Sequence, residues 1–255
     1  MRIAIAPDRP ALGQFVALKA AEILRTVLQS KRTVNLVVAT GSSQFEVLSS
    51  LVSQPDVEWN RVHGFHLDEY LGIADSHPAS FCGYLKDRFV SRVPLASFHF
   101  MNGTFPANKL KQQADAALSG HEIDLMLCGI GENGHLAFND PPANFEAEDP
   151  YLIVELDEAC RRQQVGEGWF DSMNSVPTQA ISMSIRQIMK SKAILCTVPD
   201  RRKAEAVRNS VEGPVTNQVP ASILQQHANT LLALDTGSSS LLSTATTQTC
   251  EMVSA

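Results

Sequence analysis

The stretch 123–142, IDLMLCGIGENGHLAFNDPP, limits the folds open to this chain more than any other segment. Its first six residues are apolar except for Asp124, a pattern that predicts a strand buried on both faces. The strand runs into a glycine-rich loop, where the missing side chains would let backbone amides approach a ligand closely. The loop glycines are Gly129, Gly131 and Gly134. His135 and Asp140 follow at once, and such groups at the end of a buried strand are typical of a ligand site in an α/β sheet.

The rest of the chain alternates between short apolar runs and amphipathic stretches. This alternation predicts strands joined by helical crossovers, and hence a three-layer α/β fold with a mainly parallel sheet covered on both faces. The expected strands span residues 2–6, 34–39, 62–66, 97–100, 123–128, 151–156, 180–185, 193–198 and 231–234. Because the 255 residues contain no linker or repeat, we expect one domain over 1–255, with a tail from about 237 that is helical at first and then frayed.

Charge and composition argue against several classes of function. A formal net charge of −6 and an isoelectric point near 5.6 disfavour a nucleic-acid partner and an anionic membrane. The N-terminal apolar run is too short for a signal peptide and no stretch approaches a membrane span, so we expect a cytoplasmic protein. The five cysteines include no CxxC pair, and no His, Asp or Glu spacing indicates a metal, so neither disulfides nor a metal site are expected.

Polar residues follow several of the expected strands, and parallel strands bring such positions to one edge of a sheet. The loop 40–43, TGSS, has hydroxyls and free amides that suit an anion, although a plain helix cap is the simpler interpretation. Asp68 and Glu69 follow the next strand and are either functional or merely solvated loop residues. Lys203 and the loop 129–140 also follow strands, so all of these groups are expected along the same carboxyl edge.

The side chains expected at this edge are suited to acid–base chemistry, since they include carboxylates, an imidazole, an amide and a lysine. Isomerising a sugar needs one group that opens the ring and one base that moves a proton between adjacent carbons, and a His and an Asp on separate loops could supply both. GIGENG also matches the dinucleotide pattern G-x-G-x-x-G. It lies midway along the chain and is followed by HLAFN rather than an obvious nucleotide-binding helix, so a dinucleotide cofactor is disfavoured.

Motifs that occur in order between residues 34 and 235 resemble a known family: TGSS, HLDEYLGI followed by HPASF, GIGENGHLAFNDPP, and VPDRRKAEAV followed by VEGPVTNQVPASILQQH. In this combination the chain resembles the glucosamine-6-phosphate deaminase (isomerase) family. The resemblance implies a modified Rossmann-like fold and an enzyme without metal or organic cofactor. It also implies that glucosamine 6-phosphate, or a close hexosamine 6-phosphate, reacts with water to give fructose 6-phosphate and ammonia.

The same resemblance implies roles for individual residues. Asp68 matches the base that takes the C2 proton of the open-chain substrate and returns it at C1, leaving an imine for water to hydrolyse. His135 matches the residue that opens the ring. The residues implied to frame the sugar are Gly129, Gly131 and Gly134. The residues implied to bind the phosphate are Thr40, Gly41, Ser42, Ser43 and Lys203.

Two positions depart from the family pattern. Asn133 stands where many members have an acid, and its amide can orient His135 by a hydrogen bond but cannot stabilise an imidazolium with charge. Asp140 stands where the family usually has glutamate. The aspartate keeps the carboxylate, but its side chain is shorter by one methylene. Because a small displacement of a catalytic group can cost about 100-fold in rate, either the backbone adjusts or the preferred substrate differs. The segment 144–155 has no basic residue, so activation by an acetylated amino-sugar phosphate is not expected.

Several alternatives stay open. A sugar-phosphate hydrolase resembling 6-phosphogluconolactonase would share the fold and a Gly-His loop, although LDEY and AFN argue against it. A non-catalytic sugar-phosphate sensor is the second alternative. The segment 159–170 is either a mobile lid, with Arg161 or Arg162 as a further phosphate partner, or a solvated surface helix. The family includes monomers and larger assemblies, so a homo-oligomer is also open.

Overall fold

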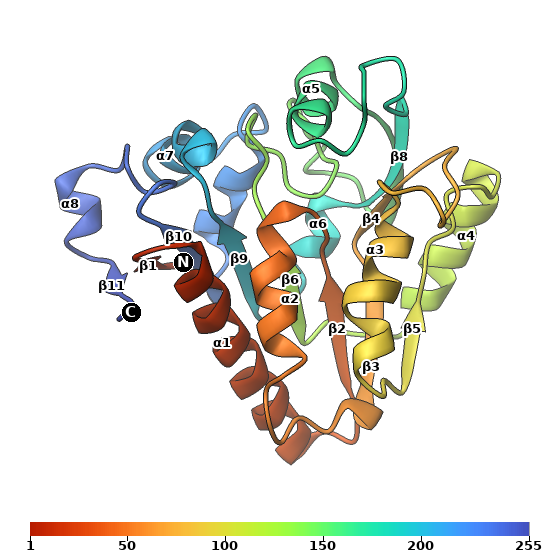
Figure 1. The fold of residues 1–255 in the computed structure, drawn as a ribbon, viewed down its shortest axis with the longest axis horizontal. Coiled ribbons are helices and arrows are strands. Elements are labelled where there is room, and N and C mark those ends of the chain that lie inside the picture. The colour runs from red at the N-terminus through yellow and green to blue at the C-terminus, as the bar shows by residue number, and fades with distance from the viewer. Residues whose placement is uncertain (255) are drawn as a thin grey trace.

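The computed structural model describes residues 1–254, and their main feature is a parallel central sheet (Figure 1). Eight strands of this part of the chain lie in the order β11-β1-β10-β9-β6-β2-β3-β5, and every neighbouring pair is parallel. The strands are β1 (Arg2–Ala6), β2 (Val34–Val38), β3 (Val62–His66), β5 (Ser97–His99), β6 (Leu125–Cys128), β9 (Ile194–Val198), β10 (Thr230–Asp235) and β11 (Glu251–Met252). The predicted α/β class with a mainly parallel sheet is confirmed.

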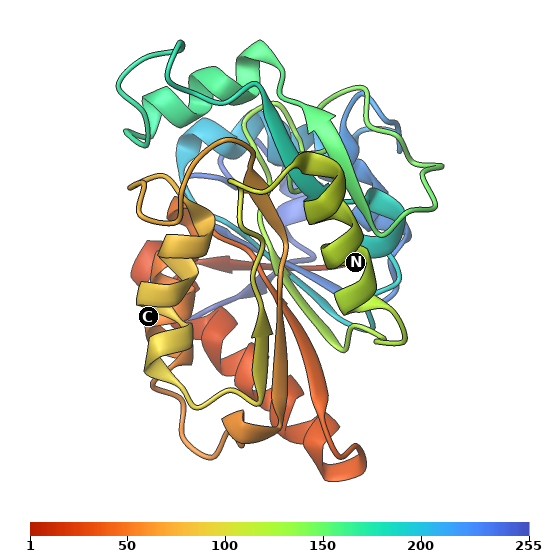
Figure 2. The ribbon, with the colours of Figure 1, turned by 90° about the vertical axis from the view of Figure 1, so that its right-hand side faces the viewer.

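Helices cover both faces of this sheet, as Figures 1 and 2 show. One face carries α1 (Arg9–Ser30), α2 (Phe45–Leu51) and α3 (Phe81–Arg88), and the other carries α4 (Ala107–Leu118), α6 (Ile185–Ile188) and α7 (Ala204–Glu212). Because strand side chains alternate between faces, β6 feeds both cores: Leu125 and Leu127 pack on the α1 side, and Met126 and Cys128 on the α4 side. A strand that is buried on both faces is therefore apolar along its whole length.

A second, small antiparallel sheet stands beyond the carboxyl ends of the parallel strands. Its order is β4-β8-β7, formed by β4 (Asp68–Tyr70), β8 (Gln179–Met183) and β7 (Tyr151–Glu155). In Figure 1, β4 and β8 lie toward the upper end of the molecule, near α5 (Glu158–Gly166). The predicted strands β7 and β8 are confirmed. The prediction that Asp68 lies in a loop is wrong, because Asp68 is the first residue of β4. Only Leu67 separates β3 from β4, so the chain passes from one sheet to the other without a turn signal.

The C-terminal tail also differs from the prediction. Instead of a helix that frays, the residues up to 254 form turns, the short helix α8 (Thr244–Thr247) and the strand β11. β11 pairs with β1, and the main-chain N of Val253 donates to the carbonyl of Ile5 at 2.9 Å. This pairing covers backbone groups of β1 that would otherwise be exposed at an edge of the sheet.

Candidate active site

A cavity opens where β2, β3, β6 and β9 end, at the carboxyl edge of the parallel sheet. The strand register explains why the predicted loops meet there: Val38 pairs with His66, so Thr40 and Asp68 both lie two residues beyond the same rung. β6 and β9 are paired in parallel in the same way. The predicted site residues that line this cavity are Thr40, Gly41, Ser42, Ser43, Asp68, Gly129, Gly131, His135 and Lys203.

The loop 40–43 is held in place by the buried side chain of Gln44. The amide Nε2 of Gln44 donates to Oγ of Ser43 at 3.2 Å and to the carbonyl of Cys128 at 3.1 Å. A Cβ on residue 129 would lie 3.0 Å from the same serine oxygen, so Gly129 lets the two loops touch. The loop after β2 and the loop after β6 therefore form one continuous wall of the cavity.

Gly131 makes room for the imidazole of His135. A Cβ on residue 131 would lie 2.2 Å from Cε1 of that ring, which leaves no space for any other residue type. The main-chain N of Gly131 donates to the carbonyl of His135 at 3.0 Å, and Gly134 donates to the carbonyl of Gly131 at 3.0 Å. Gly134 has a φ of +85°, in the left-handed region that favours glycine, and it does not line the cavity. Gly131 and Gly134 thus shape the turn that presents His135.

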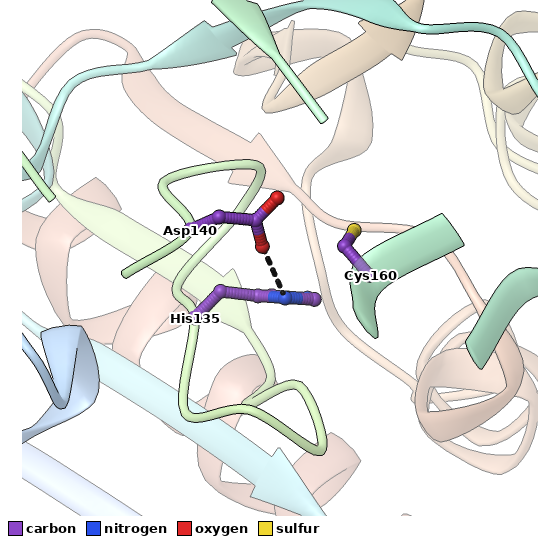
Figure 3. Close-up of side chains that lie close together, drawn as sticks. All are labelled: His135, Asp140 and Cys160. Atoms are coloured by element: carbon purple, nitrogen blue, oxygen red, sulfur yellow. Dashed lines mark ion pairs between the residues drawn. The ribbon is translucent and has the colours of Figure 1, made fainter. Parts of the chain in front are cut away.

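The imidazole of His135 is paired with the carboxylate of Asp140 (Figure 3). Nδ1 lies 3.0 Å from Oδ1, and the two side chains are only 11% and 6% exposed. Burial raises the pKa of Asp140, but His135 and hydrogen bonds from Asn133 and Asp157 outweigh it and hold the pKa below its usual value. Asp140 is therefore ionised at neutral pH and can stabilise an imidazolium, so the shorter aspartate does reach the histidine.

Asn133 orients this pair without contacting the ring. Its Oδ1 accepts a hydrogen bond from the main-chain N of His135 at 3.1 Å. Its Nδ2 donates to Oδ1 of Asp140 at 3.0 Å and to Oδ2 of Asp157 at 3.2 Å. Asn133 thus orients His135 by a hydrogen bond, as expected, and the charged partner of the imidazolium is the carboxylate of Asp140. Asn133 and Asp140 lie behind the imidazole and do not line the cavity.

Cys160 of α5 completes the group drawn in Figure 3 and was not singled out from the sequence. Ligand atoms of His135, Asp140 and Cys160 lie within 4.8 Å of one another, a spacing at which three residues can hold a metal ion. Burial, reinforced by the nearby carboxylates of Asp140 and Asp157, raises the pKa of the Cys160 thiol. The thiol therefore keeps its proton at neutral pH in the metal-free site.

Asp68 faces the cavity from β4, and its residue is only 6% exposed. Burial, and to a lesser extent repulsion from Glu69, raises its pKa to about 8. A carboxyl group with a pKa near neutrality is suited to both taking and returning a proton. The interpretation of Asp68 as a solvated loop residue is wrong, because β4 pairs with β8, where Asp68 lies opposite Ser182, and buries the side chain.

Glu69 has a different environment, although it is the next residue. Its carboxylate accepts hydrogen bonds from the main-chain N of Tyr70, Phe81 and Cys82 and from the hydroxyl of Ser80, at the start of α3. Burial raises the pKa of Glu69 to about 7, although these four hydrogen bonds oppose the shift. Adjacent strand residues point to opposite sides, so one acid is available to a ligand and the other anchors a helix.

Lys203 reaches the other end of the cavity from a turn after β9, and its side chain is 9% exposed. Burial lowers its pKa, whereas the carboxylates of Glu167 and Glu132 act in the opposite direction. Arg9 and Arg202 line the same cavity, and sequence reasoning missed both. The position of Arg202 next to Lys203 is a signal that could have identified it, but nothing local in the sequence connects Arg9 with this site.

The C-terminal part of α5 covers this end of the cavity, but not with the predicted side chains. Neither Arg161 nor Arg162 lines the cavity, contrary to the expectation for a lid. Arg161 donates to two main-chain carbonyls of the following loop, and Arg162 pairs with an acid one turn away on the helix surface. Gln163, Gln164 and Glu167 point inward instead. The i, i+4 spacing of Gln163 and Glu167 is the signal that could have identified this face.

Comparisons with known proteins agree with this arrangement. Residues 7–233 match the family described as glucosamine-6-phosphate isomerases/6-phosphogluconolactonase. A glucosamine-6-phosphate deaminase of Oenococcus oeni is 36% identical over 246 residues, which cover 95% of this chain and 99% of that relative. The deaminase of Clostridium acetobutylicum is 34% identical over 249 residues, covering 95% and 100%.

Solved structures give the same result. The structure of a monomeric glucosamine-6-phosphate deaminase superposes with a TM-score of 0.86 at 28% identity, covering 94% of this chain and 100% of that one. A 6-phosphogluconolactonase of Trypanosoma brucei superposes with a TM-score of 0.78 at 15% identity, covering 95% and 98%. The lactonase shows that the fold is shared, whereas the deaminases are similar in both fold and sequence.

Proposed function

This chain belongs to the family of glucosamine-6-phosphate isomerases and 6-phosphogluconolactonases, and from that membership we propose that it is a glucosamine-6-phosphate deaminase. It converts a hexosamine 6-phosphate and water to fructose 6-phosphate and ammonia. The observation that carries the proposal is the placement of Asp68 and His135 in one cavity that also contains Lys203 and the loop 40–43. One cavity thus holds a carboxyl with a pKa near neutrality, an imidazole and an anion-binding group.

At one end of the cavity the phosphate group would be bound. Lys203 supplies a buried ammonium, and Ser42 and Ser43 supply hydroxyl donors. A charged hydrogen bond to a phosphate oxygen is about twice as strong as a neutral one, so Lys203 is expected to contribute most of the affinity. Binding at this end fixes the distance of the sugar carbons from Asp68 and His135.

At the other end, protonated His135 would deliver a proton to the ring oxygen and take up the proton that the C1 hydroxyl loses, which opens the ring to the aldehyde. Asp140 stabilises the protonated form of His135. Ionised Asp68 then removes the proton from C2, and the electron pair forms the C1–C2 double bond of an enolamine as the C1 carbonyl oxygen takes the proton held by His135. Returning that proton to C1 leaves an imine at C2, which water hydrolyses to the ketone with release of ammonia.

The lactonase alternative has weaker support, because the lactonase structures share only the fold with this chain. The substrate panel that tests the proposal therefore includes glucosamine 6-phosphate, galactosamine 6-phosphate and 6-phosphogluconolactone. Ammonia and fructose 6-phosphate are measured with coupled enzymes. Turnover of glucosamine 6-phosphate supports the proposal. Lack of turnover of every hexosamine 6-phosphate, or full activity in Asp68→Asn, would overturn it.

Several expectations about partners rest on the sequence alone. No helix in residues 1–254 is long and apolar enough to cross a membrane. A cytoplasmic location, the absence of a nucleic-acid partner, a homo-oligomer and a single domain over the whole chain stay predictions.

A further inference from the structure

The carboxylate of Glu167 lies among the groups proposed to bind phosphate. Its Oε2 accepts a hydrogen bond from Oγ of Ser42 at 3.3 Å, and its Oε1 lies 3.7 Å from Nζ of Lys203. Two residues near the end of α5 hold it from the other side: Gln163 donates to Oε1 at 2.8 Å, and the indole N of Trp169 donates to Oε2 at 3.2 Å. The Glu167 side chain is 7% exposed. An anion of the protein therefore shares two of the proposed ligands of the substrate phosphate.

The other cations of this end have acidic partners too, but those partners are closer to solvent. Nε of Arg9 lies 2.9 Å from Oε2 of Glu46, whose side chain is 32% exposed. Nη2 of Arg202 lies 2.9 Å from Oδ2 of Asp200, whose side chain is 34% exposed. Charges close to solvent are screened, so these two acids oppose a phosphate less than a buried carboxylate does. Glu167 is therefore the acid that opposes phosphate binding most strongly at this end of the cavity.

We propose that Glu167 occupies the phosphate subsite in the empty enzyme and is displaced when the phosphate group of the substrate binds. This inference rests on the proposed function, because that function identifies Lys203 and Ser42 as phosphate ligands. The ammonium of Lys203 and the hydroxyl of Ser42 cannot neutralise and hydrogen-bond both the carboxylate and a phosphate. A carboxylate and a phosphate a few ångströms apart in a buried site also repel each other strongly. The phosphate brings the greater charge, so the carboxylate leaves.

The backbone around Glu167 is suited to such an exchange. The residue lies at the end of α5 between Gly166 and Gly168. A Cβ on either glycine would meet nothing within 4 Å, so the segment is not wedged between neighbours. Gly168 has a φ of +80°, in the region that glycine adopts without strain. The main-chain N of Glu167 donates to the carbonyl of Gln163 at 2.8 Å, so the exchange requires the carboxylate side chain to move and not the end of α5.

Affinity for inorganic phosphate, measured by isothermal titration calorimetry at fixed ionic strength, tests the exchange without requiring turnover. Glu167→Gln keeps the size of the side chain and removes its charge. We expect this variant to bind phosphate about tenfold more tightly than the wild type. The matched control is Glu132→Gln, which removes a charge 3.8 Å from Arg202 and acts on Lys203 only through its more distant field, without an ion pair to Lys203 or a hydrogen bond to Ser42. We expect the control to tighten phosphate binding by less than about twofold.

Trp169 provides a second readout, because its indole donates to the carboxylate that is displaced. The chain has two tryptophans, and Trp59 packs against Phe89, so Trp59→Phe leaves Trp169 as the only indole fluorophore. In this background we expect saturating phosphate to change the emission of Trp169. Adding Glu167→Ala should abolish that change, because the hydrogen bond is then absent from the start.

Phosphate binding to Glu167→Gln that is equal to or weaker than binding to Glu132→Gln would overturn the inference, as would the absence of phosphate binding to every variant. Binding to Glu167→Gln but not to the wild type would support it. If phosphate affinity changes as expected and no hexosamine 6-phosphate is turned over, the proposed function fails and the exchange stands. If turnover is intact and Glu167→Gln binds phosphate no better, the exchange alone fails.

Discussion

The two ends of the active-site cavity differ in how their charged side chains are held. At the sugar end, Asp140 contacts His135, accepts from Nδ2 of Asn133 and accepts from the main-chain N of Asp157, so hydrogen bonds fix the segment 129–150 around the imidazole. At the phosphate end, the partners of Lys203 include Glu167, an acid of the protein between two glycines. The sugar end is preorganised for catalysis, whereas the phosphate end must exchange one anion for another. The difference predicts that changes at the sugar end lower kcat and changes at the phosphate end raise KM.

The largest effect is expected at the sugar end, from Asp68→Asn. An amide cannot take the C2 proton, so kcat should fall by about 1000-fold while KM changes little. Steady-state assays of ammonia release measure both constants. Glu69→Gln is the control, because it changes the neighbouring acid that anchors α3 and is expected to lower stability rather than kcat of the folded protein. Equal losses of kcat in the two variants would contradict the distinction between these acids.

A somewhat smaller effect, of the opposite kinetic kind, is expected from Lys203→Ala. Loss of the buried ammonium should lower kcat/KM by about 100-fold, mainly through KM, because the ammonium holds a group that does not react. The control is Lys192→Ala, whose ammonium pairs with Glu122 on the surface. A fall in kcat with unchanged KM would show that the phosphate end takes part in the chemistry. It would contradict the distinction between a sugar end that sets kcat and a phosphate end that sets KM.

Asp140→Asn tests whether the sugar end depends on charge or only on shape. The amide keeps the size of the side chain but loses the negative partner of the imidazolium, so we expect kcat to fall about 30-fold with little change in KM. Circular dichroism and a thermal melt establish that the variant is folded. An equal rise in KM would mean that Asp140 shapes the binding site rather than positions His135.

A smaller difference between the two ends is expected in their pH dependence, with kcat/KM changing between pH 7 and pH 8 and phosphate affinity not rising. Because burial raises the pKa of Asp68 to about 8, most of the carboxyl is protonated at pH 7 and half is ionised at pH 8. The ionised form is the base, so kcat/KM should rise about fivefold between these values. Phosphate affinity is not expected to rise over the same interval. A value of kcat/KM that is flat from pH 7 to pH 9 would contradict this prediction and show that the base of the free enzyme is already ionised at pH 7.

The smallest effect is expected from metal removal. The proposed proton transfers use Asp68 and His135, and the phosphate contacts use Lys203 and hydroxyls. Dialysis against EDTA should therefore leave turnover unchanged within error. Loss of activity that Zn²⁺ restores would point back to the cluster of His135, Asp140 and Cys160 and would mean that its thiol ionises.

The sequence predicted what is encoded locally and missed what depends on contacts between distant segments. The strands of the parallel sheet follow from apolar runs, and the meeting of Thr40, Asp68 and the glycine loop follows from the geometry of parallel strands. The contact of Asp140 with His135 depends on how the loop turns back, and local signals did not indicate it. Glu167 enters the cavity because α5 crosses it, which depends on the separate position of the small sheet.

The order of the strands also has a consequence for the synthesis of this protein. β1 is the first strand of the described chain, yet its neighbours in the sheet are β10 and β11, which are the last two. Arg2 pairs with Leu231, so β1 has no partner in the sheet until the chain has been made as far as β10. β2, β3 and β5, by contrast, pair with one another early. Contacts so distant along the chain form slowly, so the N-terminal strand is expected to be the last to settle during folding.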